Sequence, residues 1–303
     1  MRSITQPGPP VPERVQWVEA RGCAFSFTLE AGLPLLEAAR RGFAEAGFAG
    51  GVLGMRGGAL GPFAYVMPAL SKTGANAAFY SDTFRPHGIT RLKLAAMTLG
   101  MRDGESFFHC HGLWTETDGY LHGGHILPEE SIVAEPFVVE AFGIDGAMFT
   151  AEVDTETNFK LFGPVAFPSE VGTGSREGNG LNNRDARDGL NETSRAFALR
   201  LRPNQDFAVA LETFCRQHGI FRARIHGGVG STIGAHFTDG RSVVPFATEL
   251  AVRSGTITPN ADGKLEAALD VALVDYLGGI AEGRRTRGDN PVLMTMELVL
   301  EVL

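Results

Sequence analysis

The chain has 303 residues, a formal net charge of −8, and a composition that is 44% hydrophobic and 20% charged. These proportions are ordinary for a globular protein, and the length suggests about two domains. The acidic balance disfavours a broad electrostatic grip on the phosphates of nucleic acid. The sequence has no long uninterrupted apolar run, so it predicts no membrane-spanning helix.

The cysteines and the first residues indicate the compartment. Cys23, Cys110 and Cys215 are far apart and odd in number, which is not the spacing of a disulfide framework. This pattern favours a reducing environment, so we expect a cytoplasmic protein. Residues 1–20 are polar and rich in proline, without the apolar segment of a signal peptide. We interpret them as an N-terminal arm.

Residues 21–162 are predicted to form a first domain. Cys23–Leu29 alternates as a half-buried strand does, and Leu33–Ala46 carries apolar residues at helical spacing. The glycine-rich stretch Gly50–Ala59 is predicted to be a strand running into a tight turn, because no helix of the dinucleotide-binding type follows it. Further strands are predicted at Leu92–Met101, Ser106–Trp114 and Ile132–Phe142.

Residues 163–193 interrupt this pattern. They are rich in glycine, asparagine and charge, so we predict a linker between two domains. After them the first pattern returns, because Ala196–Leu201 is similar to Ala24–Leu29 at a spacing of 172 residues (196 − 24). The repeat predicts a second domain over residues 194–303 and an internal duplication of one unit.

The predicted fold class is α+β, with two tandem units that each contain an antiparallel or mixed sheet and one flanking helix. The spacing between the two halves shortens toward the end of the chain. The first unit is therefore expected to carry extra residues in the loop Ser71–Arg91.

Histidines concentrate in one stretch of the first unit. His109 and His111 are at positions i and i+2 of a predicted strand, so their side chains point to the same face. Asp118-Gly119 is typical of a hairpin turn and brings His125 alongside them. Three imidazoles without a fourth protein ligand are typical of an open zinc site. The alternative is that these are ordinary core or surface histidines.

The second unit does not repeat the histidines. Ala268–Val271 and Gly283–Arg285 stand where the ligands would recur. We therefore predict one metal ion per chain, zinc or another divalent ion, bound by His109, His111 and His125.

Several of these features together resemble the PCC domain (plants and prokaryotes conserved), which accompanies AT-hooks in plant nuclear proteins. They are the glycine-rich turn after the first helix, His-x-His on a strand, the Asp-Gly turn, and Gly123–Pro128 before a valine-rich strand. Residues 20–160 match the family pattern throughout, and residues 194–303 match it in strand pattern only.

This resemblance implies a small α+β fold, assembly as a trimer, and zinc on the three histidines, here His109, His111 and His125. Prokaryotic members are often described as predicted DNA-binding proteins, and that description comes from the family. The chain departs from the nuclear proteins because it has no Arg-Gly-Arg-Pro sequence to enter a minor groove.

Three functions are compatible with the sequence. The first is a zinc-dependent hydrolase or lyase acting on a small carboxylate or lactone, because an open zinc site activates water and polarises carbonyls. The second is a DNA-binding or regulatory protein, which the acidic charge disfavours. The third is a structural oligomer whose metal only holds the fold together. Candidate catalytic residues for the enzyme are Arg56 and Arg85 to clamp an anion, His87 to transfer a proton, and Glu116 to orient an imidazole.

We also expect a small-molecule ligand, no membrane partner, and a homo-oligomer that is a trimer of two-domain chains. The three histidines approach a metal from one side of a sheet, so its far side needs a wall. The metal is therefore expected in a pocket at a domain or subunit boundary. Candidate walls are the loop that carries Tyr80, Asp82, Arg85 and His87, and the turns that carry Arg56 and His226.

Overall fold

The structure, a computed structural model, describes residues 1–168 and 193–303. Most of the predicted linker over residues 163–193 therefore lies outside the described residues. Its first residues require a correction, because β13 (Lys160–Ala166) is a strand that pairs along its whole length with β12 (Ala147–Val153).

The described strands before residue 169 are β1 (Val15–Leu29), β2 (Gly50–Arg56), β3 (Ala59–Leu60), β4 (Tyr65–Val66), β5 (Pro68–Leu70), β6 (Ala78–Tyr80), β7 (Thr90–Arg102), β8 (Glu105–Thr115), β9 (Leu121–Ile126), β10 (Val133–Glu135), β11 (Phe137–Asp145), β12 and β13. Those after residue 192 are β14 (Ser194–Leu201), β15 (Ala223–His236), β16 (Ser242–Pro259), β17 (Leu265–Asp275), β18 (Ile280–Arg284) and β19 (Val292–Val302). The predicted arm of residues 1–20 is shorter than expected, since β1 already begins at Val15.

The described residues form two helices, α1 (Leu35–Glu45) and α2 (Phe207–Gln217). Each ends beside a glycine with positive φ, 78° at Gly47 and 65° at Gly219, as is common at helix C-termini. The side chain of Asp206 caps the start of α2 by accepting a hydrogen bond from a backbone N–H of the first turn. Neither helix is long and apolar enough to cross a membrane.

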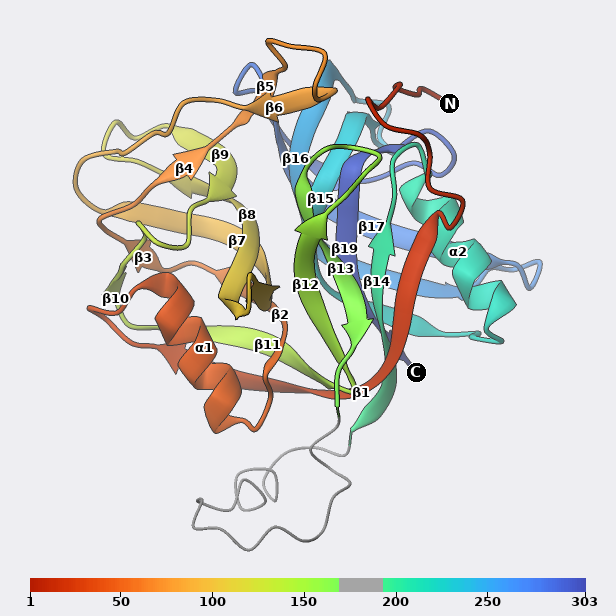
Figure 1. Ribbon diagram of the computed structural model, residues 1–303, viewed down its shortest axis with the longest axis horizontal. Coiled ribbons are helices and arrows are strands. Elements are labelled where there is room, and N and C mark those ends of the chain that lie inside the picture. The colour runs from red at the N-terminus through yellow and green to blue at the C-terminus, as the bar shows by residue number, and fades with distance from the viewer. Residues whose placement is uncertain (169–192) are drawn as a thin grey trace, which may run out of the picture.

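The two halves of the chain have the same strand order. In the first half it is β1-β11-β2-β7-β8-β9, and in the second it is β14-β19-β15-β16-β17-β18, with antiparallel pairing throughout both runs. The long strand β1 joins them, because its residues 21–29 pair with β11 and its residues 15–22 pair with β14 (Figure 1). The fold is therefore α+β, and mostly an antiparallel sheet.

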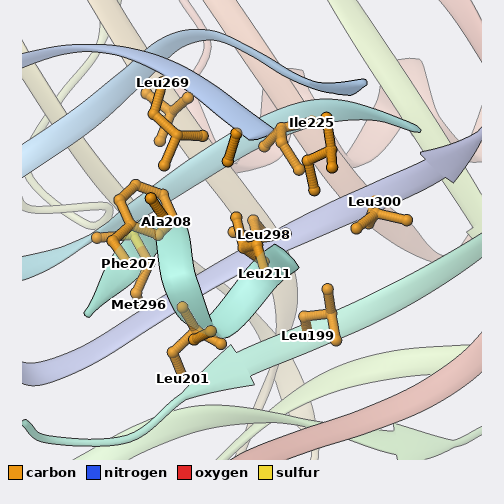
Figure 2. Close-up of a cluster of buried hydrophobic side chains, with 14 of the residues drawn as sticks. Leu199, Leu201, Phe207, Ala208, Leu211, Ile225, Leu269, Met296, Leu298 and Leu300 are labelled. Atoms are coloured by element: carbon orange, nitrogen blue, oxygen red, sulfur yellow. The ribbon is translucent and has the colours of Figure 1, made fainter. Parts of the chain in front are cut away.

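Each helix covers the outer face of the sheet in its own half (Figure 1). Figure 2 shows the second-half core, where Leu211 of α2 packs near Leu298 of β19 and side chains of the neighbouring strands complete the cluster. The first-half core is built in the same way around Phe43 of α1 and Trp114 of β8, both fully buried. Burial of this apolar surface is the main stabilising contribution in each half.

The strands of both halves belong to one continuous sheet through β1, and the inner faces of its two halves, called the two sheets below, pack against each other. A small apolar cluster joins Leu94, Ala96 and Leu113 of the first half to Val229, Ala251 and Ala272 of the second. Period-two alternation explains this arrangement, because residues beside these on the same strands point outward into the helix-covered cores. The boundary between the halves is therefore a packed sheet-to-sheet interface.

A buried ion cluster also ties the halves together. The Asp154 carboxylate, in the turn after β12, accepts hydrogen bonds from Arg200 (Nη2–Oδ2 2.8 Å), from Arg202, and from the Thr157 backbone N–H at 2.9 Å. Burial raises the pKa of Asp154, but Arg200 and the hydrogen bonds outweigh that effect and lower it to about 2. The folded state therefore favours the ionised carboxylate.

We predict that Asp154→Asn lowers the free energy of unfolding by about 3–5 kcal/mol, because it leaves two arginines without their buried counter-charge. Urea unfolding measures this change. The matched control is Asp103→Asn, whose exposed partner is Lys160, and it should change stability by less than about 1 kcal/mol. Equal effects of the two substitutions would contradict the prediction.

Acid should act through the same carboxylate. Its folded-state pKa lies below the ordinary value of 3.8, so its contribution is present above pH 3.8 and is lost as the pH falls toward about 2. We expect wild-type stability to decline in this window and Asp154→Asn to decline less steeply, as measured by urea unfolding at each pH. An unchanged slope in the variant would show that other groups dominate.

Candidate metal centre

Three histidines converge at the interface between the sheets. His109 and His111 alternate with the buried core residues of β8, and the β8–β9 register places His125 directly opposite His111. His111 Nε2 lies 3.0 Å from His109 Nε2 and 3.2 Å from His125 Nδ1. The structure thus brings together the three residues predicted as ligands.

The outer nitrogens of two rings are held by acceptors. His111 Nδ1 lies 3.1 Å from the carbonyl oxygen of Leu250, and His109 Nδ1 contacts a carboxylate oxygen of Glu297. A carbonyl oxygen can only accept, so His111 Nδ1 carries the hydrogen and the neutral ring presents a lone pair on Nε2. An ionised Glu297 imposes the same tautomer on His109.

The Nε2 atoms of His109 and His111, 3.0 Å apart, therefore face each other as lone pairs. Such an arrangement is repulsive unless a cation lies among them. Ligand nitrogens bound about 2.0–2.1 Å from a tetrahedral zinc ion are roughly 3.3 Å apart, close to the spacing seen here. Burial, and then the neighbouring imidazoles, lower the pKa of His111 and His125 well below the ordinary value, so both favour the neutral form that a metal requires.

The second half contributes two glutamates that were not among the residues predicted from the sequence. Glu297 of β19 is fully buried against His109, and a carboxylate oxygen of Glu249 on β16 lies 3.9 Å from His111 Nε2. One oxygen of each has no hydrogen-bond partner among the described residues. Burial raises the pKa of Glu249 well above its ordinary value. A signal for both existed, because Glu249 is the single acidic residue of β16 and Glu297 lies between two apolar residues of β19.

A cavity of about 50 Å³ opens beside the triad. Its walls come from both halves and include Tyr80, Phe159, Ser231, Glu249, Met294 and Thr295. Tyr80, on β6 of the extra first-half loop, packs edge-on against His125 with ring centroids 5.3 Å apart. This loop was one of the expected walls, and the inner face of the second sheet supplies the other side.

Two of the candidate catalytic residues are arginines that are held elsewhere. Arg56 donates to the carbonyl oxygen of Arg253 at 3.1 Å, and Arg85 forms an exposed ion pair with Glu130 at 2.6 Å. Neither side chain belongs to the described lining of the cavity beside the triad. The expected anion clamp is therefore not formed by these two arginines at this cavity.

The other two candidates lie near the β8–β9 turn. His87 is exposed, and its carbonyl oxygen accepts a hydrogen bond from Thr117. Glu116 accepts a hydrogen bond from the indole N–H of Trp114 at 3.2 Å, and no described contact joins it to an imidazole of the triad. Glu116 instead lies in a small group with Asp118 and His122.

The second half has an ion-pair cluster where the triad would recur. Asp270 of β17 lies directly opposite Arg284 of β18 in the strand register, as His111 of β8 lies opposite His125 of β9 in the first half. Asp270 contacts Arg253 at 3.4 Å, and Arg253 also contacts a nearby carboxylate on β18. Opposite charges have thus replaced the converging imidazoles, in agreement with the sequence.

Comparison with known proteins supports the family resemblance. Residues 190–303 match the family described as the Plants and Prokaryotes Conserved (PCC) domain. The matching half is the one that lacks the histidine triad, whereas the sequence analysis expected the closer match in the first half. None of the curated proteins is similar to the chain at a significant level.

Three solved structures are similar to parts of the chain. A plant- and prokaryote-conserved (PPC) protein from Pyrococcus horikoshii is 20% identical, with a TM-score of 0.37 over 50% of this chain and 97% of that chain. A metal-containing protein from Archaeoglobus fulgidus is 19% identical, with a TM-score of 0.34 over 46% and 91%. A candidate DNA-binding protein from Ralstonia eutropha is 14% identical, with a TM-score of 0.34 over 46% and 89%.

Proposed function

For this chain, which carries a PCC domain over residues 190–303, we propose a divalent metal centre, with zinc as the best fit, that acts on a small carbonyl compound. The observation that carries the proposal is the convergence of three imidazole nitrogens at 3.0–3.2 Å while the outer nitrogens of His109 and His111 are held by acceptors. Because those acceptors fix the tautomers, a cation is the natural occupant of the space between the rings.

The charge of the surroundings supports the same occupant. Glu249 and Glu297 are buried, and each has a carboxylate oxygen without a hydrogen-bond partner among the described residues. Two buried carboxylates are costly alone, and a divalent cation offsets both charges. The donor set of three imidazoles with nearby carboxylates is one that zinc accepts.

A zinc ion bound here would activate water and polarise a carbonyl group. The described lining of the cavity contains Glu249 and no lysine or arginine, so it offers no counter-charge to an anionic substrate and favours an uncharged one. Of the two classes expected from the sequence, the lactone type therefore fits better than the carboxylate. The free oxygen of Glu249 is placed to accept a proton beside the triad.

We infer that the two halves are tandem copies of the same domain. The first copy spans about residues 21–162 and the second spans residues 194–303. The equal strand order supports this inference, together with the sequence offset of 172 residues that relates the early part of the two halves. A trimer of such chains has to form through outer surfaces, because the inner sheet faces already cover each other within one chain. Light scattering that gives a stable 32.4 kDa monomer would exclude the trimer.

Metal analysis of the purified protein is expected to give one equivalent per chain, and His111→Ala is expected to lose most of it. His122→Ala is the matched control, because His122 pairs with Asp118 at 2.9 Å near the same hairpin but outside the triad. Two equivalents in the wild type, or loss of the metal in the control alone, would show that the triad is not the single site.

Glu249→Gln separates a catalytic centre from a structural one. If Glu249 acts as a proton acceptor, the variant keeps its metal and loses about a hundredfold or more in hydrolysis of a panel of small lactones. A variant that loses metal together with activity would make Glu249 a fourth ligand. A centre closed by four protein ligands is typical of a structural role, and the enzymatic proposal would then be abandoned.

DNA binding is the competing function. With a net charge of −8, we expect the protein to bind a labelled duplex weakly and only at low salt. Fluorescence anisotropy across a salt series measures this. Submicromolar affinity at physiological salt would favour a DNA-binding role over the enzymatic one.

A further inference from the structure

A second unusual polar group lies on the helix-covered side of the second sheet, away from the triad. Arg285 is only 3% exposed. Its Nη2 donates to Thr232 Oγ1 at 3.1 Å and is 3.4 Å from the carbonyl oxygen of Gly234, whereas Nε and Nη1 have no hydrogen-bond partner among the described residues. None of the ion pairs between described residues includes Arg285. This buried guanidinium thus has no carboxylate within ion-pair distance among the described residues.

The equivalent position of the first half is occupied by an apolar residue instead of an arginine. Phe237 forms an isolated bridge with Arg285, and Tyr65, at the same offset of 172 residues (237 − 65), pairs with Ile126. Ile126 is fully buried in the first-half core. The second half therefore has an arginine at an apolar core position, a substitution that is costly unless the charge is used.

The residues around Arg285 are also more polar than their equivalents in the first half. Thr232 and Asp206 stand at the offset positions of Leu60 and Pro34 (232 − 60 = 172 and 206 − 34 = 172). The isolated bridge from Pro34 to Ile132 recurs as the bridge from Asp206 to Pro291, which supports this equivalence. An apolar corner of the first unit is thus a polar corner in the second.

The guanidinium of Arg2, in the N-terminal arm, also lies close to Arg285. Arg2 contacts Gly234, where an added Cβ would lie 2.5 Å from Arg2 Nη1. Its Nη2 donates to the carbonyl oxygen of Asp289 at 2.8 Å, and its Nε, which has no hydrogen-bond partner among the described residues, lies 3.7 Å from Asp289 Oδ1. Burial, and then the charge of Arg2, lower the pKa of Arg285 to about 9, which leaves it protonated at neutral pH.

The nearby carboxylates do not satisfy Arg285. Asp206 accepts hydrogen bonds from the backbone N–H groups of Val209 and Asn290, at 2.9 and 2.8 Å. Asp289 accepts from the backbone of Arg2 at 3.2 Å and lies 3.3 Å from a ring nitrogen of His236. Both acidic groups are thus engaged by other donors.

We propose that Arg285 and Arg2 form a buried site for a small anion, which the N-terminal arm closes. Its donors are the two N–H groups of Arg285 that have no partner among the described residues (Nε and Nη1), and the guanidinium of Arg2, which also contacts Asp289, adds a second positive charge. Charge-assisted hydrogen bonds from guanidinium groups suit phosphate, carboxylate and halide alike. Anion binding would fix the arm to the second half.

The test is thermal unfolding of the full chain in chloride, acetate or inorganic phosphate, with ionic strength held constant by a bulky sulfonate salt. A ligand that binds only the folded state raises the midpoint with its concentration. We expect at least one of the three anions to raise the wild-type midpoint by several degrees, and the anion that acts identifies the ligand class. A midpoint that does not depend on any of the three anions would overturn the proposal.

Three variants assign the effect. Arg285→Ile copies the first-half residue and should lose the anion dependence, whereas Arg91→Ile, at an exposed strand arginine, should keep it. Arg2→Ala leaves the core untouched and should weaken the apparent anion affinity at least tenfold, so it tests the site even if Arg285→Ile does not fold. A wild-type response in both Arg285→Ile and Arg2→Ala would place the anion elsewhere and overturn the proposal.

Discussion

The balance of buried charge between the two sheets is the constraint on which this structure depends. The inner faces meet through small apolar side chains, yet the same interface encloses three imidazoles and two glutamates. Such groups are tolerated in a packed interface only when their charges and hydrogen bonds are matched. A cation among the rings matches them, and the site then requires both halves, since the histidines come from one sheet and the glutamates from the other.

The sequence predicts the triad because its determinants are local. His109 and His111 are two residues apart on one strand, and one hairpin turn returns His125 to them. Glu249 and Glu297 are contributed by strands that meet the triad only through tertiary packing, 188 residues away in the case of His109 and Glu297. No local periodicity encodes that approach, so the glutamates were missed although Glu249 is the single acidic residue of β16 and Glu297 lies between two apolar residues of β19.

The predicted start of the linker at residue 163 was wrong for a different reason. Residues 163–166 contain Gly163 and Pro164, which favour a loop when read locally. In the structure they belong to β13, whose described ladder is to β12 on one side. A proline is tolerated on such an edge because its missing N–H faces away from the ladder. The first helix was predicted to within two residues at each end, as Leu33–Ala46 against the observed Leu35–Glu45, because the period of 3.6 extends over several turns and Gly47 follows the helix.

In a chain that contains two fused units, each half can carry a different part of one site. In a homo-oligomer, every subunit must carry all the residues of the site. In an assembly of identical units, each copy has to carry the histidines for its own site and the acidic residues for its neighbour's site. A covalent link fixes which half meets which, so the histidines are needed once and the glutamates once. The released positions can then change, as Asp270 did to an ion-pair partner of Arg253 and Arg285 did from an apolar core residue to a buried cation. The asymmetry between the halves is thus what one shared site would produce, whereas two independent sites would preserve both sets of ligands.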